Sequence, residues 1–289
     1  MQTMDAIKDS GKGDNSFILR EFPMTDGDFA QIQQLAKLRT GIELGEHKKE
    51  MIYSRIVRRI RTLRLGDFHS YLEYLEANPE AELTNFINAI TTNLTSFFRE
   101  SHHFDYLKNQ VVPELLARKK ASGRVRIWSA GCSTGEEPYS IAMTIQGQLD
   151  RERWDCKILA TDLDTNVLAH GKAGVYAQDR IGNMDPELVR RFFNEAGPSS
   201  RAVKESLKQL IRFNQLNLLG DWPMKGRFDV IFCRNVVIYF SKDTQRQLFD
   251  RFANIIEPEG YMFIGHSESL HGVTNRFESV GRTIYRKLA

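Results

Sequence analysis

Short apolar runs alternate with helix-like stretches from Arg124 to the end of the sequence, and this pattern restricts the fold more than any other feature. The clearest runs are VRIWSAG, CKILATDLD and FDVIFCRNVVIY. Strands that alternate with amphipathic helices form a parallel sheet with helices on both faces. The run RTIYRKLA follows GYMFIGHSE after a spacer too short for a crossover helix, so we expect it to lie antiparallel beside that strand. The sequence therefore predicts an α/β domain over residues 124–289.

The first part of the chain instead has apolar residues at helical spacing. Thr25 and Asp28 match a capping box, and Gly41 lies where the helix that follows should end. A second helix is expected from His47 to Leu65, and the helices after it complete a small bundle. Glycine and proline turns later interrupt the α/β pattern. We accordingly predict a disordered tail over residues 1–20, a helical N-terminal domain over 21–112, a linker over 113–123 and an inserted subdomain over about 173–212.

Composition and charge narrow the class of protein. With 41% hydrophobic residues and a formal charge of +3, the chain can bury real cores but lacks the excess charge of a nucleic-acid coat. Three cysteines without CxxC spacing provide neither a disulfide framework nor a zinc ribbon, and this favours a reducing compartment. The polar N-terminus does not resemble a signal peptide, and the most apolar stretch is too short for a membrane span. We expect a cytoplasmic protein without membrane insertion.

The turn after the first strand, AGCSTGEE, is the first candidate for a ligand site. In α/β sheets a glycine-containing turn at this place lets a ligand approach the backbone. A P-loop would have Lys and then Ser or Thr after the second glycine, but this chain has Glu136 and Glu137, which repel phosphate. A capping box accounts for one of these glutamates and leaves the other unexplained. A cationic ligand with hydroxyl groups, such as S-adenosylmethionine, fits this acidic turn.

Polar residues at the ends of later strands support a cofactor that contains a nucleoside. Asp162 and Asp164 end the second strand, where a carboxylate can bind a ribose diol, although either could instead cap the next helix. Asp162 lies farther from the glycines than the NAD fingerprint requires, which weighs against NAD. Asn217 follows the third expected strand, where its amide can contact an adenine. Arg234 interrupts an apolar strand, so it needs a carboxylate partner or a ligand.

Three strings in the sequence point to a family: TTNLTSFFRE at 91–100, STGEEPYSIA at 133–142 and FCRNVVIYF at 232–240. In content, order and spacing they resemble the CheR-type chemotaxis receptor methyltransferases, which use S-adenosylmethionine to methylate glutamate side chains of bacterial chemoreceptors. The resemblance implies a seven-stranded, Rossmann-like methyltransferase domain with a small β insertion, preceded by an all-α N-terminal domain. It also implies S-adenosylhomocysteine as the product and a role in chemotactic adaptation.

The resemblance assigns residues to this reaction by matching motif. Arg99 and Tyr239 are the implied catalytic residues, nearest the reacting carboxylate. Other accounts stay open, since Thr95 could cap a helix and Tyr239 could be a half-buried strand residue. No metal is expected, because the adjacent His102 and His103 cannot form the i, i+4 pair of a helical metal site. The implied cofactor contacts are Asn93, Thr95, Arg99, Glu137, Asp162, Asn217, Leu218, Arg234 and Asn235.

The implied partner is the helical cytoplasmic domain of a chemoreceptor. The helix after His47 carries seven basic residues and one acidic residue up to position 64, more than a solvated face requires. We expect Arg55, Arg58 and Arg59 to bind the acidic acceptor, with a solvated face as the alternative. Some family members also bind a receptor C-terminal peptide through a glycine-rich turn. The corresponding FFNEAGPSSRAV contains only Gly197, which puts that tether in doubt.

Two other functions compete with this interpretation. A nucleic-acid methyltransferase would use the basic helix to follow phosphates. However, RNVVIY occupies the place where amino-directed DNA enzymes have Asp or Asn, Pro, Pro and an aromatic residue. A noncatalytic cofactor sensor is the second competitor, but the retained Arg99, Asp162 and Tyr239 favour an active enzyme. The sequence thus predicts a glutamate O-methyltransferase that does not act on nucleic acid.

Overall fold

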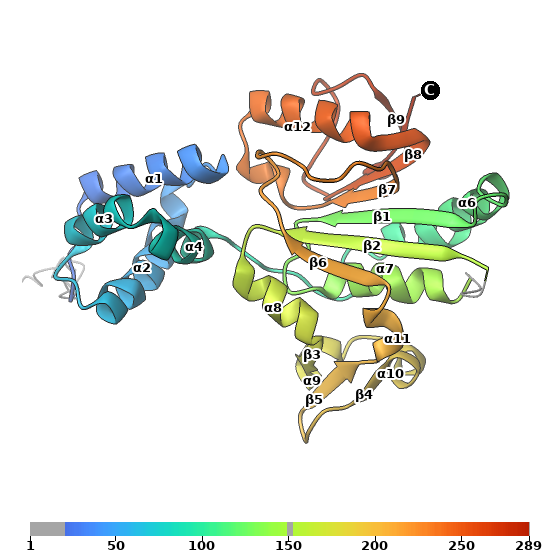
Figure 1. Ribbon diagram of the computed structural model, residues 1–289, viewed down its shortest axis with the longest axis horizontal. Helices are drawn as coiled ribbons and strands as arrows, with labels where there is room; N and C mark the ends of the chain where they lie inside the picture. The colour runs from blue at the N-terminus through green and yellow to red at the C-terminus, as the bar shows by residue number, and fades with distance from the viewer. Residues whose placement is uncertain (1–20, 149–152, 289) are drawn as a thin grey trace, which may run out of the picture.

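The structure is a computed structural model that describes residues 21–148 and 153–288, so the predicted tail over 1–20 lies outside the described residues. Figure 1 shows a group of helices at one end and a larger sheet with its own helices at the other, joined by one extended stretch after α4. No helix within these described ranges is long and apolar enough to cross a membrane.

Four α-helices and a short 3₁₀ helix form the N-terminal domain, and their ends match the capping signals in the sequence. The Thr25 hydroxyl accepts from the Asp28 N–H and the Asp28 carboxylate accepts from the Thr25 N–H, which confirms the capping box. Gly41 ends the first helix with a left-handed φ of 74°. The helices bury an apolar core of their own. Their bounds are α1 Asp26–Thr40, η1 Glu46–Lys48, α2 Lys49–Leu63, α3 Phe68–Ala77 and α4 Pro79–Ile90.

Seven strands form the central sheet, in the order β6-β2-β1-β7-β8-β10-β9. The first five of these pair in parallel, as the alternation of strands and helices predicts. Strand β10 pairs antiparallel with β8, as expected for the last apolar run, and β9 adds an edge strand that the sequence pattern did not reveal. The bounds are β1 Arg124–Ala130, β2 Asp155–Asp162, β6 Ile211–Gln215, β7 Phe228–Cys233, β8 Ile256–Ile264, β9 Phe277–Gly281 and β10 Ile284–Lys287.

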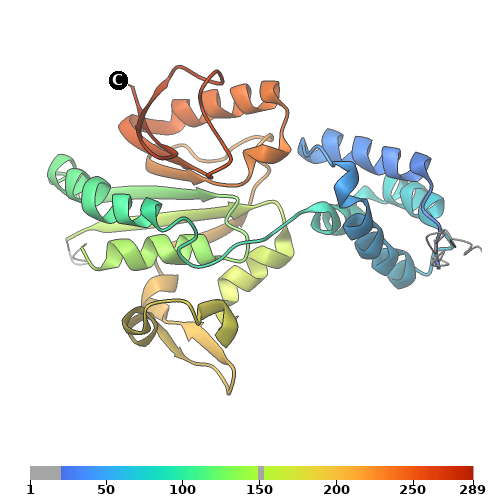
Figure 2. The ribbon, with the colours of Figure 1, turned by 180° about the vertical axis from the view of Figure 1, so that it is seen from behind.

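Helices cover both faces of the sheet and bury a separate apolar cluster on each. Helices α6 and α7 lie on the face turned toward the viewer in Figure 2, and α12 lies on the opposite face, seen in Figure 1. The bounds are α5 His102–Tyr106, η2 Leu107–Val111, α6 Val112–Arg118, α7 Glu136–Gln146, α8 Thr165–Ala173, η3 Val237–Tyr239 and α12 Lys242–Ile255.

The packing of α5 to α6 differs from the predicted division of the chain at residues 112 and 113. Phe104, Leu107 and Leu115 belong to the same buried cluster as Ile127 of β1, so these helices pack on the sheet and not in the N-terminal bundle. Segment η2 is π-helical and leads directly into α6, whose start contains Pro113. The predicted boundary between residues 112 and 113 therefore lies too far toward the C-terminus. Helical periodicity identifies the apolar face of a helix but does not indicate which core covers that face.

A small antiparallel sheet occupies the stretch expected to form the inserted subdomain, between α8 and β6. Its strand order is β3-β5-β4, and Gly197 lies in the turn between β4 and β5 with a φ of 118°. In Figure 1 it projects from the edge of the main sheet below β6. The bounds are β3 Val175–Ala177, α9 Gln178–Ile181, α10 Pro186–Phe192, β4 Phe193–Glu195, β5 Ser200–Val203 and α11 Glu205–Lys208.

Candidate functional site

A cavity lies where the carboxyl ends of the parallel strands meet the N-terminal domain. This is the edge of an α/β sheet at which ligands bind. The extended stretch after α4 forms one wall, and Thr40 at the end of α1 and Ile42 just after it contribute to another. The residues implied as cofactor contacts or catalytic residues all line it: Asn93, Thr95, Arg99, Glu137, Asp162, Asn217, Leu218, Arg234, Asn235 and Tyr239.

The glycine turn after β1 forms the floor of this cavity. Gly131 has a φ of 86°, and a Cβ there would lie 2.3 Å from Cγ2 of Val236, so only glycine fits. The Ser133 N–H donates to Oδ2 of Asp162 over 2.8 Å. This bond ties the turn after β1 to the end of β2, so the two strands present their polar ends to the same space.

The two glutamates of the turn do not form a capping box, which corrects the simplest expectation for them. Gly135 is the N-cap of α7 and offers no side chain. Glu136 instead pairs with Arg180 and accepts from the Thr134 hydroxyl. Glu137 accepts from Ser129 over 2.7 Å. Glu137 therefore does not cap a helix, and it lines the cavity.

Arg234 neutralises part of this buried charge. Its Nη1 lies 3.0 Å from Oε2 of Glu137, and its Nη2 lies 3.5 Å from Oε2 of Glu100. Nη2 also donates to the carbonyl of Arg99. Burial raises the pKa of the Glu137 carboxyl, while the charge of Arg234 opposes that rise. The prediction that Arg234 needs a carboxylate partner is confirmed.

Asp162 and Asp164 have separate roles at the end of β2. Burial raises the pKa of Asp162, which is held by the backbone N–H groups of Ser133 and Asp164. Asp164 caps α8, and its other oxygen accepts from the Thr91 hydroxyl over 2.8 Å and from the Asn93 amide over 2.7 Å. Asp164 thus fixes the extended stretch over the cavity, whereas Asp162 is directed toward the cavity itself.

Tyr239 and Arg99 lie at the mouth of the cavity. Burial raises the pKa of the Tyr239 hydroxyl, and the charge of Arg99 opposes that rise. The ammonium of Lys48 lies 3.9 Å from the centre of the Tyr239 ring, so the start of α2 reaches the site. Arg99 donates from Nη1 to the carbonyl of Leu94 over 2.9 Å. A phenol and cations therefore surround the entrance, where an anionic acceptor would be attracted.

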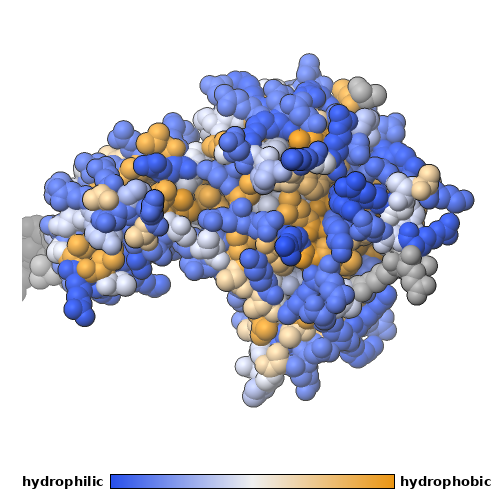
Figure 3. All heavy atoms as spheres, in the orientation of Figure 1, coloured by the Kyte–Doolittle hydropathy of each residue, from blue (hydrophilic) through white to orange (hydrophobic). Residues whose placement is uncertain are grey.

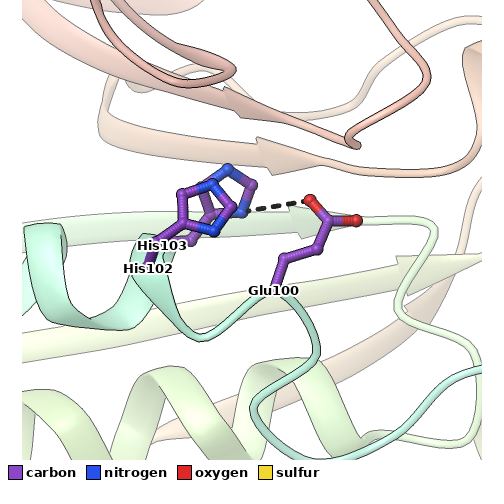
Figure 4. A group of neighbouring side chains, drawn as sticks. All are labelled: Glu100, His102 and His103. Carbon is purple, nitrogen blue, oxygen red and sulfur yellow. Dashed lines mark ion pairs between the residues drawn. The ribbon is translucent and has the colours of Figure 1, made fainter.

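Behind Arg234, Glu100 lies beside two histidines (Figure 4). Figure 4 shows its carboxylate directed toward His103, and one ligand-type atom from each of Glu100, His102 and His103 lies within 4.8 Å of the others. This spacing would suit a metal, but the positive guanidinium of Arg234 is 3.5 Å from the same carboxylate and disfavours a cation. The arrangement is better explained as support for Arg234, and the expected absence of a metal stays a prediction.

The pH dependence of the free energy of unfolding tests whether His103 is a neutral buried ring. Burial, followed by the charge of Arg234, lowers the pKa of His103 to about 3. In the unfolded chain this histidine binds a proton below about pH 6.5, whereas in the folded protein it stays neutral down to about pH 3. The free energy of unfolding should therefore fall as the pH drops below about 6.5. The slope should reach about 1.4 kcal/mol per pH unit. Urea unfolding at pH 7.5 and 5.0 should therefore show a smaller pH effect for His103→Gln than for the unchanged protein.

The exposed His271 gives the matched control for this measurement. His271→Gln should keep the pH dependence of the unchanged protein, because it leaves the buried ring of His103 in place. Parallel stability curves for His103→Gln and the unchanged protein would contradict the assignment of His103 as a neutral buried ring.

Sequence reasoning missed one residue that shapes the site, Glu268. Its carboxylate is only 7% exposed and accepts from the backbone N–H groups of Asn235, Val236 and Val237, each over 3.0 Å. It also accepts from Gly265 over 2.6 Å. The signal in the sequence was a glutamate placed directly after an apolar strand, in GHSE. Glu268 fixes the loop that follows Arg234, and burial raises the pKa of its carboxyl.

The three arginines expected to bind the partner lie on α2 in different environments. Arg55 donates to the carbonyls of Ala89 and Thr91, and Arg59 forms an ion pair of 2.6 Å with the buried Glu82. Arg58 is exposed. None of the three lines the cavity, and Arg58 is the one whose environment leaves it accessible to a partner.

Comparisons with known proteins agree in one family. Residues 93–286 match the family model described as CheR methyltransferase, SAM binding domain, and residues 27–91 match the CheR methyltransferase all-alpha domain. A probable chemotaxis protein methyltransferase of Rhizobium etli is 45% identical over 85% of this chain and 94% of its own. Chemotaxis protein methyltransferase 2 of Pseudomonas aeruginosa is 45% identical over 92% and 95%. The chemotaxis protein methyltransferase of Escherichia coli is 41% identical over 94% and 96%.

Proposed function

The chain belongs to the CheR methyltransferase family, and from this premise we propose that it transfers methyl groups to glutamate carboxylates on the helical cytoplasmic domain of chemoreceptors. It is an S-adenosylmethionine-dependent methyltransferase of chemotaxis. The observation that carries the proposed acceptor is the contrast between an acidic cavity and a cationic entrance. Glu137 and Asp162 lie inside, whereas Lys48, Arg99 and Tyr239 surround the mouth.

The residues of the cavity fit S-adenosylmethionine. Two carboxylates, the buried Glu137 and the partly buried Asp162, face a space that the buried Arg234 also lines, so negative charge is left to pair with a cationic ligand. Asp162 would hold ribose hydroxyls, and Asn217 with Leu218 would contact the adenine. Glu137 would face the amino acid part of the cofactor. When bound, the cofactor supplies an electrophilic methyl group on a positively charged sulfur.

An acceptor glutamate needs no general base at neutral pH. Its carboxylate has an ordinary pKa of about 4.3 and is already ionised, so a lone pair is available for attack. The chain must therefore position this anion and exclude water, and such positioning can supply about 7–11 kcal/mol in favourable cases. We assign this role to the Tyr239 hydroxyl and the Arg99 guanidinium, which can donate to one carboxylate oxygen and leave the other to react. S-adenosylhomocysteine is then the second product.

Tyr239→Phe tests the role of the hydroxyl. Loss of a hydrogen bond to a charged acceptor corresponds to about 1.5–3 kcal/mol, so turnover should fall by about 10- to 100-fold. Cofactor affinity should change little, because the aromatic ring is kept. Steady-state rates and calorimetric titration with S-adenosylhomocysteine measure the two quantities. Unchanged turnover would remove Tyr239 from the mechanism.

Arg58→Glu tests whether the basic face of α2 attracts an acidic acceptor. Charge reversal of an exposed residue should raise the KM for a receptor fragment and reduce its dependence on salt, since complementary charge mainly speeds encounter. Arg59 is unsuitable for this purpose, because removing it would leave the buried Glu82 without its partner. If Arg58→Glu has the same KM as the unchanged enzyme at low salt, and again at high salt, then this face of α2 does not bind the acceptor and is only exposed to solvent.

The decisive experiment for the proposed function is transfer of labelled methyl from S-adenosylmethionine to a chemoreceptor cytoplasmic fragment, followed by mild base. Methyl esters of carboxylates hydrolyse under these conditions, whereas N-methyl groups persist. Base-labile label on glutamate is the expected result. Base-stable label on the receptor, or label on nucleic acid added in parallel, would overturn the proposal. Cofactor binding without transfer to receptor would favour a sensor instead.

A further inference from the structure

Two large apolar side chains are exposed in the segments that carry the cavity lining. Leu94 exposes 78% of its surface and Ile238 exposes 46%. Leu94 lines the cavity from the extended stretch after α4, and Ile238 immediately precedes Tyr239 in η3. On the face drawn in Figure 3, apolar atoms gather where the N-terminal helices meet the larger domain. Burying a leucine or isoleucine is favourable, so side chains left in water beside a reaction site require an explanation.

The backbone holds Leu94 firmly in this exposed position. The Arg99 guanidinium donates to its carbonyl over 2.9 Å, and the preceding carbonyl, of Asn93, accepts from the Ser133 hydroxyl over 2.8 Å. The Asn93 side chain donates to Asp164 over 2.7 Å. The exposure of Leu94 is therefore fixed by polar contacts on both sides.

Ile238 is presented in the same way. The N–H groups of Val236 and Val237 donate to Glu268, each over 3.0 Å. The Val237 carbonyl accepts from Gln245 over 2.9 Å. Both apolar side chains are thus carried by an ordered backbone, and a surface that is ordered before binding loses little entropy when a partner arrives.

The two segments meet at the catalytic tyrosine. Thr92 and Leu94 line the same cavity as Tyr239, the residue that follows Ile238. The ammonium of Lys48 lies over the same tyrosine ring, and Arg58 is exposed on the helix that follows. Apolar side chains therefore border the reaction site, with the positive charge of Lys48 beside it. This combination matches an acidic helix that also has apolar side chains, and it disfavours a purely polar segment.

We propose that Leu94 and Ile238 receive the apolar side chains that flank the acceptor glutamate on a helix of the receptor. On a helix, residues three and four positions from the glutamate lie on the same face, so they reach the enzyme together with it. Contact with Leu94 and Ile238 then sets how deeply the acceptor carboxylate enters the cavity and how the receptor helix is rotated about its axis. The basic side chains of α2 contact the acidic residues of that helix. The pair thus selects glutamates that have apolar neighbours one turn away. This inference rests on the proposed function.

The test compares Leu94→Asn, Ile238→Asn and the double variant with the unchanged enzyme on a folded receptor cytoplasmic fragment. Each single change should raise the KM for the fragment by about tenfold, a typical effect for a centrally placed contact. Ile238 is not among the residues that line the cavity, so Ile238→Asn should also preserve kcat and cofactor affinity. Leu288→Asn is the matched control, because Leu288 is 45% exposed and does not line the cavity. It should behave as the unchanged enzyme. Thermal melting verifies that the variants, all at exposed positions, are folded.

Three results would overturn the inference. An unaltered KM in the double variant, while the unchanged enzyme methylates the fragment, would refute the apolar contact and leave the proposed function standing. Failure of the unchanged enzyme to methylate the fragment would refute both. Sedimentation gives the third: if the unchanged protein self-associates and the double variant does not, the occupant of this surface is a second copy of the chain and not a receptor helix.

Discussion

Glu268→Gln should lower the free energy of unfolding by about 2–6 kcal/mol, because a buried donor left without an acceptor costs about 1–3 kcal/mol and two donors are affected. Each oxygen of Glu268 accepts two backbone N–H groups: Asn235 and Gly265 share one, and Val236 and Val237 share the other. The amide nitrogen of glutamine would have to face one of these pairs of donors. The side chain is 7% exposed, so water cannot easily compensate.

The same change should also weaken cofactor binding. Well below the melting temperature a destabilised variant is still folded, so a loss of stability alone would not lower its affinity. Asn235 has a left-handed backbone φ of 58°, which among residues other than glycine asparagine adopts most readily, and Glu268 accepts from its N–H and holds it there. Both Asn235 and the neighbouring Val236 line the cavity. We expect the affinity for S-adenosylhomocysteine, measured by calorimetry at 10 °C, to fall at least tenfold.

Glu278→Gln is the matched control for Glu268→Gln, since Glu278 is an exposed glutamate on β9. Surface substitutions of this kind usually change stability by less than about 0.5 kcal/mol. Urea unfolding should thus separate the two variants clearly. If Glu268→Gln unfolds at the same urea concentration as Glu278→Gln and binds the cofactor product normally, the loop after Arg234 does not depend on this carboxylate.

The sequence was informative where structure depends on neighbouring residues. Alternation of apolar runs and helices predicts the parallel sheet, and the capping box at Thr25 with the stop at Gly41 follows from residues three to four positions apart. The position of Asp162 at the end of a strand places it at the cavity for the same reason. Matching motifs then brought together residues from distant segments that periodicity alone could not relate.

Contacts between distant segments could not be predicted in this way. Arg234 and Glu137 are 97 positions apart, and Glu268 is 31 to 33 positions from the loop that it holds. A local pattern suggested a capping box for Glu136 or Glu137, although the partners of Glu137 are Ser129 of β1 and Arg234, the residue after β7. Charge counting on α2 likewise could not reveal that Arg59 pairs with Glu82 of α4. Such pairs depend on how elements pack, which the order of residues along one element does not state.

Arg234→Met should have the other large effect. The Arg234 side chain is 2% exposed and lies between Glu137 and Glu100, so its removal leaves a buried carboxylate without its counter-charge. Breaking a buried pair by removing one partner costs about 3–5 kcal/mol. We expect this loss in the free energy of unfolding, measured in urea at neutral pH, together with no detectable binding of S-adenosylhomocysteine.

A second substitution separates the effect on stability from the effect on binding. In Arg234→Met/Glu137→Gln the carboxylate that lost its partner is neutral, the bond from Ser129 can be kept, and Glu100 still has His266 at 3.0 Å. Much of the lost stability should return, since neutral replacement of a buried ion pair is often tolerated. Binding of S-adenosylhomocysteine should remain absent, because we assign the ammonium group of its amino acid part to the carboxylate of Glu137. Arg246→Met, which removes an exposed pair with Asp243, should cost at most about 1 kcal/mol and leave binding intact. If the double variant is no more stable than Arg234→Met, the charge of Glu137 is not what Arg234 compensates.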